Sequence, residues 1–500
     1  MNSHLLALPI ALPLLAGALL LGSERLHAST RRRLSLLASA CGLLLALRLL
    51  DHALEAGTVV SAMGNWPTRI GIVLVLDPLA ALMLCLTGVL GCVAALHGVN
   101  ADHDGARWHG LLQFQLMGLN GAFLTGDLFN LFVSFEVLLI SSYGLLLAST
   151  GRNSIRAGVG YVLINLAGSS VFLVALALVY GCAGTLNMAD LGATLGQMSP
   201  QQQATMQIAG ALLMLVFAIK AALLPLCFWL PGGYAASSGA AAALFAVLTK
   251  VGLYALLRVG STVYGSAADD AFALLLPVGL ATLALGALGA LAAPDLARFA
   301  AHTVIASAGT GMVAFATGSV ASVAAGISYL LPSTLASALL FLLADQLRHM
   351  RGGSDQLKAF GAAAPPAALK VLLFVALLAV SSVPPFPGFL AKALLLNASS
   401  ASLVWPILLG ASLVLLLASM RGFAMIAWKR SAPPPGVATD ELRGAWLAPM
   451  LLIAIMVSMS VGMAPLYRAA EMAAQSALDP GAIANAQQRA TILPRPPVAP

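Results

Sequence analysis

Residues 127–147, DLFNLFVSFEVLLISSYGLLL, form a membrane-length apolar run with a glutamate, Glu136, near its middle. A transmembrane helix needs about 20 predominantly apolar residues, and this stretch has that length. A carboxylate at bilayer depth costs about 2.5 to 3.5 kcal/mol, so it normally faces a protein interior or a wet cavity. The run therefore predicts a transmembrane helix whose buried acid needs a partner or a proton.

The composition extends this reading to the whole chain. Of its 500 residues, 60% are hydrophobic and only 9% are charged, and the mean hydropathy is +0.95. Soluble proteins average about 25% charged residues, so the chain is a polytopic membrane protein. The length has room for about 14 helices and leaves none for a soluble domain between them. The formal charge of +7 comes from scattered basic residues, which indicates membrane topology and not nucleic-acid binding.

Apolar runs bounded by polar residues, Gly or Pro predict an all-α fold with the spans 4–22, 34–50, 70–97, 109–126, 128–149, 157–180, 205–227, 240–263, 270–292, 301–319, 322–347, 367–396, 401–425 and 445–467. The N-terminus lacks a basic region, so we expect a retained first helix and not a cleaved signal. The polar tail after Tyr467 is expected to be amphipathic or disordered.

Basic residues concentrate in the odd-numbered connections, whereas the even-numbered ones carry little beyond Arg69 and Arg258. Cytoplasmic loops are enriched in Lys and Arg, so the odd connections are predicted to be cytoplasmic and both termini to lie on the outer side. The residues behind this prediction are Arg25, Arg31, Arg32, Arg33, Arg107, Arg152, Arg156, Arg298, Arg348, Arg351, Lys358, Lys429, Arg430 and Arg443.

Two spans are interrupted in a matching way. Residues 217–233, FAIKAALLPLCFWLPGG, combine Lys220 with Pro225 and Pro231, and residues 381–396, SSVPPFPGFLAKALLL, combine Lys392 with three prolines, Pro384, Pro385 and Pro387. The two spans lie five helices apart, and an odd step reverses direction across the membrane. We therefore expect two inverted five-helix repeats, helices 4–8 and 9–13, with broken helices 7 and 12.

The expected division is N-terminal helices in 1–108, the first repeat in 109–263, the second in 264–425, and helix 14 with a polar tail in 426–500. Backbone groups freed by a broken helix at membrane depth are tolerated where protein or water satisfies them, so we hypothesise a hydrated passage at each break. Solvent-accessibility labelling of cysteines around Pro225 and Pro387 tests this, since two dry sites would exclude it.

Three lysines in apolar surroundings, Lys220, Lys250 and Lys392, face one clear intramembrane acid, Glu136. Burial disfavours the charged form of lysine, whereas a neighbouring carboxylate favours it. Making or breaking a Glu136–Lys220 pair would thus change the proton affinity of the lysine, so that it binds and releases a proton. Lys250 and Lys392 would extend this relay. Static ion pairs are the structural alternative, but three bases cannot all pair with one acid.

Other polar residues in or near the spans leave more than one interpretation open. Asp77, followed by Pro78, fits a helix start and an ion-entry role equally well. Asp345 is expected at the membrane interface, and His302 fits a satisfied or surface histidine better than a proton relay. Five cysteines without C-x-x-C spacing predict neither a metal site nor a disulfide framework. The sequence contains no P-loop, Rossmann, HExxH or hydrolase-elbow signature in its required context, and no cofactor is expected.

Four stretches together resemble the D-type subunits of the multisubunit Mrp (Pha, Mnh, Sha) monovalent cation/proton antiporters. They are GNWPTRIGIVLVLD (64–77), QFQLMGLNGAFLTGDLFNLFVSFEVLLISSYGLLL (113–147), FWLPGGYAASSGAAAALFAVLTKVGLYALLR (228–258) and VPPFPGFLAKALLL (383–396). The family is related to the antiporter-like subunits of respiratory complex I. Those relatives commonly have WLPD where this chain has Gly232, and an acid where it has Lys392, so the antiporter family resembles this chain better.

The resemblance implies proton translocation in which Glu136 and Lys220 form the first pair, Lys250 the central bridge and Lys392 the terminal lysine. It also implies a hetero-oligomer in the bacterial inner membrane that exchanges Na⁺ or K⁺ for H⁺, driven by the proton motive force. There are two departures from the family pattern. Pro332 stands where the family often has a histidine, so water and Ser/Thr hydroxyls would carry the central relay, and Ser134 stands where Phe is usual.

Two other functions remain open from the sequence. The same relay could belong to a redox-driven complex, such as complex I or a membrane-bound hydrogenase, in which case iron–sulfur or nickel–iron partners would be encoded nearby. The chain could also be an assembly scaffold that no longer conducts protons, which the proline at 332 would favour. A scaffold would be indifferent to Lys220→Ala, whereas a transporter would not.

Overall fold

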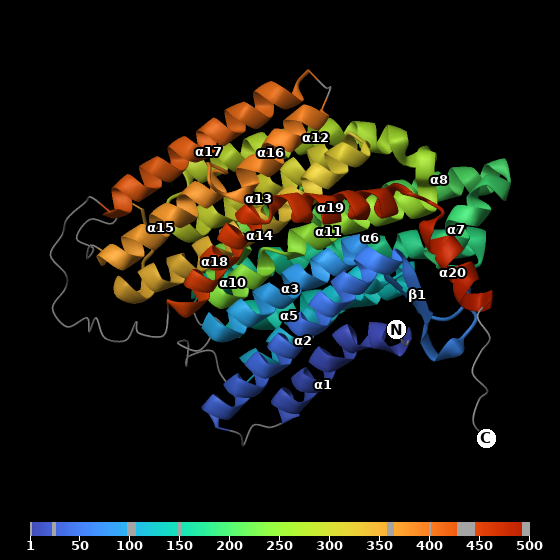
Figure 1. Cartoon of the computed structure of the whole chain (residues 1–500), viewed down its shortest axis with the longest axis horizontal. Coiled ribbons are helices and arrows are strands. Elements are labelled where there is room, and N and C mark those ends of the chain that lie inside the picture. Colours follow the sequence, from blue (N-terminus) through green and yellow to red (C-terminus); the bar gives the residue numbers. More distant parts are fainter. Residues whose placement is uncertain are drawn as a thin grey trace.

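The computed structural model describes residues 3–22, 27–97, 107–148, 152–357, 365–399, 402–427 and 446–492. Arg25, Lys358, Lys429, Arg430, Arg443, the start of the predicted span 445–467 and the last eight residues lie outside this part. The fold is predominantly helical (Figure 1). Its longer helices are α1 Leu8–Gly22, α2 Ala28–Ala56, α3 Pro78–His97, α4 Trp108–Leu124, α5 Leu128–Ala148, α6 Arg152–Ala183, α8 Pro200–Lys220, α11 Leu248–Val259, α12 Asp269–Ala292, α13 Leu296–Ala316, α14 Val320–Met350, α15 Ala367–Val380, α16 Pro387–Ala398, α17 Val404–Ala427, α18 Leu447–Val461, α19 Met463–Leu478 and α20 Ala482–Ile492.

Ten described helices are long and apolar enough to cross a membrane, and a bent pair of helices gives an eleventh. The chain is therefore a multi-pass membrane protein, as predicted. Most spans begin and end within a few residues of the expected positions, although α2 and α6 extend further at both ends. This agreement follows from the length of the apolar runs, because a helix satisfies its backbone hydrogen bonds internally where lipid cannot.

A β-hairpin corrects the all-α prediction. Strand β1 (Val59–Ala62) pairs antiparallel with β2 (Val73–Leu76), with Val59 opposite Leu76. The predicted third span, 70–97, therefore starts too early, and its helix begins at Pro78. Branched residues such as Val59, Val60, Val73 and Val75 favour strands, and in the sequence Val73 and Val75 are continuous with the apolar run of α3. Figure 1 shows the hairpin, α7 (Met188–Thr194) and α20 together at one side, which we call the hairpin end.

Both predicted broken helices are broken, and their backbones match. Helix α8 ends at Lys220, Ala222 has φ +54°, and the Leu224–Pro225 peptide bond is cis before α9 (Trp229–Ala236) begins. In the second case α15 ends at Val380, Ser382 has φ +56°, and the Pro384–Pro385 bond is cis before α16 begins. The main chain returns in the same way in each, from Leu223 N to Ala218 O and from Val383 N to Leu378 O.

The predicted span 240–263 is also interrupted, which the sequence did not indicate. Helix α10 (Gly239–Phe245) stops before α11 begins at Leu248, and the last residues form a short π-helix from Gly260 to Tyr264. The last predicted span likewise bends by 83° where α18 meets α19, at Gly462. Beyond Tyr467, α19 packs against α3 and α14, so this part of the tail belongs to the helical core.

Helix α14 is the centre of the molecule. Its 31 residues contact helices from every part of the chain, namely α3, α10, α13, α15, α16, α18 and α19. Pro332 lies inside this helix, and α14 nevertheless runs without interruption from Val320 to Met350. Two of the buried lysines lie beside this almost completely buried helix, since Lys250 lines a cavity together with Leu330 of α14, and Lys392 lies on α16, which packs against α14.

Two backbone bridges tie loops together in the same pattern. Asp127 pairs with Asn187, through Leu128 N to Leu186 O at 2.9 Å and Met188 N to Gly126 O at 2.9 Å. Asp295 pairs with Gln356, through Leu296 N to Asp355 O at 3.1 Å and Leu357 N to Pro294 O at 3.0 Å. Each bridge joins the start of one long helix, α5 or α13, to the chain that follows the next, α6 or α14.

Candidate functional site: the buried acid and three lysines

Glu136 lies on α5, which starts where Asp127 accepts a hydrogen bond from Asn130 N at 2.9 Å. The glutamate is half-buried, and its buried Oε1 has no hydrogen-bond partner within the described protein. Ser134 is buried two residues earlier, where α4 comes close at Gly121. An unpartnered carboxylate oxygen in an apolar helix is costly, and this oxygen is chemically able to bind a proton or accept a hydrogen bond from water.

Lys220 is the last residue of α8, where the free carbonyls of a helix end favour a positive charge. Its Nζ donates to the main-chain O of Asn165 at 3.2 Å and to that residue's Oδ1 at 3.4 Å. It also lies 5.9 Å from the ring centroid of Phe135, the neighbour of Glu136. Glu136 and Lys220 form no ion pair within 4.0 Å, so the predicted pair shares a region without direct contact.

A small cavity adjoins Lys220 between α5, α6 and α9. It has a volume of about 20 Å³ and is lined by Phe135, Leu138, Leu139, Tyr161, Asn165, Lys220, Trp229 and Leu248. About 10 to 15 Å³ suffices for one water molecule. The cavity therefore has room for a water beside the ammonium group of Lys220.

Lys250 and Lys392 are also buried among neutral groups. Lys250 Nζ donates to Thr249 Oγ1 at 3.2 Å, and this lysine lines a cavity of about 10 Å³ together with Tyr254 and Phe315. Lys392 Nζ donates to Ser412 Oγ at 3.0 Å and lies 5.5 Å from the ring centroid of Tyr329. Across the described residues, none of the three lysines has a carboxylate within 4.0 Å.

The prolines singled out in the sequence take two kinds of position. Pro225, Pro384 and Pro385 lie in the two breaks, between the paired helices. Pro231 lies in the first turn of α9, and Pro387 is the first residue of α16, where a missing N–H costs nothing. The second group therefore starts helices, while the first separates them.

Asp77 combines a helix start with a buried ion pair. Its Oδ1 accepts from Ala80 N at 2.8 Å, and its Oδ2 accepts from Arg258 Nη2 at 2.6 Å. Arg258, predicted to lie in a connection although it falls within the predicted span 240–263, is buried on α11 and also donates to Tyr254 Oη. That assignment was wrong because an arginine near the end of an apolar run looks the same whether it leaves the membrane or pairs inside the fold.

Hydroxyl groups connect α13 and α14 in the centre of the molecule. Ser307 Oγ lies 2.8 Å from Ser333 Oγ, and Thr303 Oγ1 lies 3.0 Å from Ser337 Oγ. The α14 members of the pairs, Ser333 and Ser337, follow Pro332 in the sequence. The pairs are of the type expected if hydroxyls replace the family's histidine. His302 is half-buried nearby on α13, and its Nδ1 has no hydrogen-bond partner among described residues.

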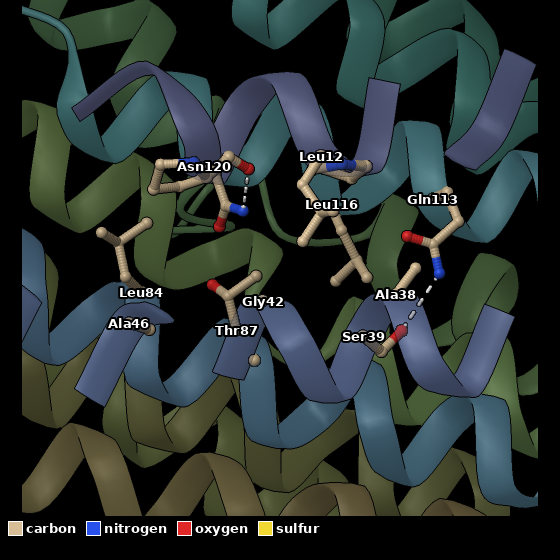
Figure 2. Close-up of a pocket in the computed structure, with 13 residues that line it drawn as sticks. Leu12, Ala38, Ser39, Gly42, Ala46, Leu84, Thr87, Gln113, Leu116 and Asn120 are labelled. Carbon is tan, nitrogen blue, oxygen red and sulfur yellow. Dashed lines mark hydrogen bonds between the residues drawn. The ribbon is translucent and has the colours of Figure 1, made fainter. Parts of the chain in front are cut away.

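A further polar cavity, of about 20 Å³, lies among the N-terminal helices. Figure 2 shows two side chains of α4 around it, with Gln113 donating to Ser39 Oγ at 3.0 Å and Asn120 donating to Pro9 O at 2.7 Å. Its described lining includes no ionisable side chain, so it has room for water among α1, α2 and α4 but offers no proton-binding group. The described residues also contain no cluster of His, Cys, Asp and Glu that could hold a metal ion.

Comparison with known proteins gives a consistent result. The family model described as NADH:quinone oxidoreductase/Mrp antiporter matches residues 125–418. The D subunit of a probable K⁺/H⁺ antiporter of Rhizobium meliloti is 39% identical over 423 residues, which are 79% of this chain and 78% of the relative. The D subunit of a Na⁺/H⁺ antiporter of Alkalihalophilus pseudofirmus is 31% identical over 486 residues, covering 96% of this chain and 98% of the relative.

Solved structures agree with these relatives. A chain of the Mrp complex from Dietzia superimposes with a TM-score of 0.85 at 26% identity, covering 97% of this chain and 99% of that chain. A chain of respiratory complex I from Thermus thermophilus superimposes with a TM-score of 0.80 at 25% identity, covering 95% of this chain and 99% of that one.

Proposed function

Because this chain belongs to the family of membrane subunits of NADH:quinone oxidoreductase and Mrp antiporters, we propose that it is the proton-translocating D subunit of a multisubunit Na⁺(K⁺)/H⁺ antiporter. It works as a secondary transporter subunit and performs no covalent chemistry. Its partners are the other subunits of the antiporter complex, in the inner membrane of a bacterium.

One observation carries this proposal: within the described structure, three buried lysines bind only neutral oxygen atoms, and the same core holds a glutamate with an unpartnered buried oxygen. If these charges formed static ion pairs, each lysine would contact a carboxylate, since an unpaired buried charge is strongly destabilising. The neutral ligands of Lys220, Lys250 and Lys392 instead accept a hydrogen bond from either protonation state. Each lysine can therefore gain and lose a proton without breaking a salt bridge.

The order of the relay follows the helices that carry it. Glu136 and Lys220 are its first pair, and the water-sized cavity at Lys220 provides a place where a water could link them. Lys250 is the central station on α11, and Lys392 is the terminal one on α16. Between these two, the Ser307–Ser333 and Thr303–Ser337 hydroxyl pairs carry the proton together with water.

The chain forms 14 spans with two inverted five-helix repeats. The first repeat consists of α4, α5, α6, α8 with α9, and α10 with α11, and the second of α12, α13, α14, α15 with α16, and α17. The matching breaks between α8 and α9 and between α15 and α16, and the matching Asp127 and Asp295 bridges, lie at equivalent points of the two series and support this arrangement. The distribution of Lys and Arg supports placing both termini on the outer side.

The decisive experiment measures dissipation of a pH gradient by added Na⁺ or K⁺ in inverted vesicles that contain the whole complex. Wild type is compared with Glu136→Gln, and native gels check that the complex remains intact. We expect the variant to lose exchange completely while assembling normally. Exchange at the wild-type rate by an intact Glu136→Gln complex would make Glu136 structural and assign the proton path to partner subunits.

The similarity to a complex I chain favours a second candidate, a proton-pumping subunit of a redox-driven complex. The two functions differ in their energy source. An antiporter exchanges cations for protons in vesicles without any electron donor, whereas a redox pump moves protons only when an electron donor is added. The same vesicles, assayed with and without an electron donor, therefore separate them.

A further inference from the structure

A chain of three titratable side chains lies at the end of the molecule opposite the hairpin, outside the relay described above. His97 is the last residue of α3, and Asp345 and His349 lie one turn apart near the end of α14. His97 Nε2 is 3.0 Å from Asp345 Oδ2, and His349 Nε2 is 3.8 Å from the same oxygen. One carboxylate oxygen thus lies between two imidazole rings.

Burial increases from His349 through Asp345 to His97. The exposed fraction of the side chain is 52% for His349, 14% for Asp345 and 4% for His97. The backbone of α10 covers the carboxylate from inside, since a Cβ added at Gly239 would lie 2.4 Å from the Cβ of Asp345. The three groups therefore lead from solvent into the packed contact of α3, α10 and α14.

The second ring nitrogen of His97 contributes no hydrogen bond to the described structure. Its Nδ1 is buried and has no hydrogen-bond partner among the described residues. A histidine that only tethers a carboxylate usually has its second nitrogen satisfied, because an unpaired buried polar atom costs about 1 to 3 kcal/mol. A histidine that passes protons needs that nitrogen free, to release inward the proton that its other nitrogen receives.

No lysine or arginine of the described structure forms an ion pair with the carboxylate of Asp345. Arg348 contributes to its field, but its guanidinium binds Asp355 at 3.1 Å and Ala235 O at 2.8 Å. On the other elements packed against α3, the titratable and charged groups at this end include His109 and Arg107 at the start of α4 and Arg31, Arg32 and Arg33 of α2. Asp345 is thus paired with two histidines, the side chains best suited to exchange protons near neutral pH.

We propose that His349, Asp345 and His97 form the proton-loading path of this subunit at the end opposite the hairpin, an assignment that rests on the proposed function. His349 takes a proton from bulk water and passes it to the carboxylate of Asp345, across a gap that one bridging water closes. In the tautomer that carries its proton on Nδ1, His97 accepts this proton at Nε2 from the carboxylic acid and releases its Nδ1 proton to a water in the interior. This leaves the Nε2–H tautomer, which donates to the ionised carboxylate of Asp345. Each transfer moves one proton, and all three groups return to their starting state after a second water resets the His97 tautomer.

The test uses the whole complex in inverted vesicles, where this end faces the medium if the predicted orientation holds. His349→Ala removes an exposed side chain, Asp345→Asn keeps the size of the carboxylate, and His97→Ala removes the inner station. His52→Ala, a histidine on α2 near the hairpin, is the matched control. We expect exchange to fall by about a hundredfold or more in the three variants, the lower end of what a positioned proton-transfer group typically contributes, and to be unchanged in the control.

Chemical rescue distinguishes proton transfer from tethering. Added imidazole should restore exchange in His349→Ala and His97→Ala, while pyrazole, a ring of the same size but a much weaker base, should not. Wild-type rates in intact His349→Ala and Asp345→Asn complexes, or slow rates that imidazole leaves unchanged, would overturn the proposal and leave a structural ion pair. Wild type and Glu136→Gln, assayed in the same vesicles, report separately on whether the complex translocates protons at all.

Discussion

Asp77 and Arg258, which are 181 positions apart in the sequence, form an ion pair of 2.6 Å whose side chains are 0% and 2% exposed. The pair joins the start of α3 to the end of α11, and Ser476 of α19 donates to the same carboxylate at 3.4 Å. Three distant parts of the chain thus meet at one carboxylate. Breaking a buried pair from one side leaves the other charge uncompensated.

Arg258→Ala should therefore destabilise the subunit by about 3 to 5 kcal/mol, because Asp77 would remain buried and charged. Thermal unfolding of the purified complex and the yield of intact complex on a native gel measure this. The double variant Asp77→Asn with Arg258→Gln is the control, since it keeps hydrogen-bonding groups and removes both charges. Equal losses in the single and double variants would show that the charges contribute nothing.

Asn165→Leu should slow cation/proton exchange by about tenfold or more, because Lys220 Nζ loses a side-chain oxygen and a hydrogen bond to a charged group contributes about 1.5 to 3 kcal/mol. The main-chain carbonyl of Asn165 remains. Asn165→Asp is the informative companion, because it places a carboxylate beside the lysine and should hold its proton. Exchange in vesicles measures both, and a faster Asn165→Asp complex would contradict the proposal that neutral ligands are needed.

Gly252→Ala should destabilise the first broken helix. A Cβ at this position of α11 would lie 2.4 Å from the backbone nitrogen of Ala221, immediately after Lys220. Overpacking of this kind costs about 1 to 3 kcal/mol. Gly232→Ala on α9 is the matched control, as no described atom beyond its own chain neighbours lies within 4 Å of a Cβ placed there. Thermal unfolding should separate the two, and equal melting temperatures would mean that α11 can move away from the break.

Ser333→Ala combined with Ser337→Ala should slow exchange several-fold, since it removes the α14 side of both hydroxyl pairs that cross to α13. Ser328→Ala is a suitable control, because Ser328 lies on the same helix, is fully buried, and its Oγ has no hydrogen-bond partner in the described structure. If the double variant exchanges as fast as Ser328→Ala, water alone carries the central relay.

The sequence could predict the features that depend on local composition. The apolar runs give the spans, Pro225 and Pro384 mark the two breaks, and the depth of Glu136 and the lysines follows from their place in those runs. The interruption between α10 and α11 was missed because residues 245–248, FAVL, include neither Gly nor Pro. Tertiary packing fixes that break, and no residue type indicates it.

The contacts between distant residues could not be predicted in the same way. The sequence predicts a helix start or an ion entry for Asp77, nothing specific for His97 and an interfacial position for Asp345, because polar residues near the end of a span ordinarily lie at the surface. Only the fold brings Arg258 to the first of these and joins the other two. Asn165 was overlooked for a similar reason, since a single amide in a long helix gives no sign that its oxygens face a lysine one helix away.

The two backbone bridges, Asp127–Asn187 and Asp295–Gln356, bear on how the helices can move. Each bridge fixes the start of one helix, α5 or α13, to the chain that follows the next, α6 or α14. Those helix ends must therefore move together. The opposite ends of α5, α6, α13 and α14 lie outside these two bridges. Any opening that admits water should therefore separate the opposite ends of these helices, while the bridged ends act as a hinge.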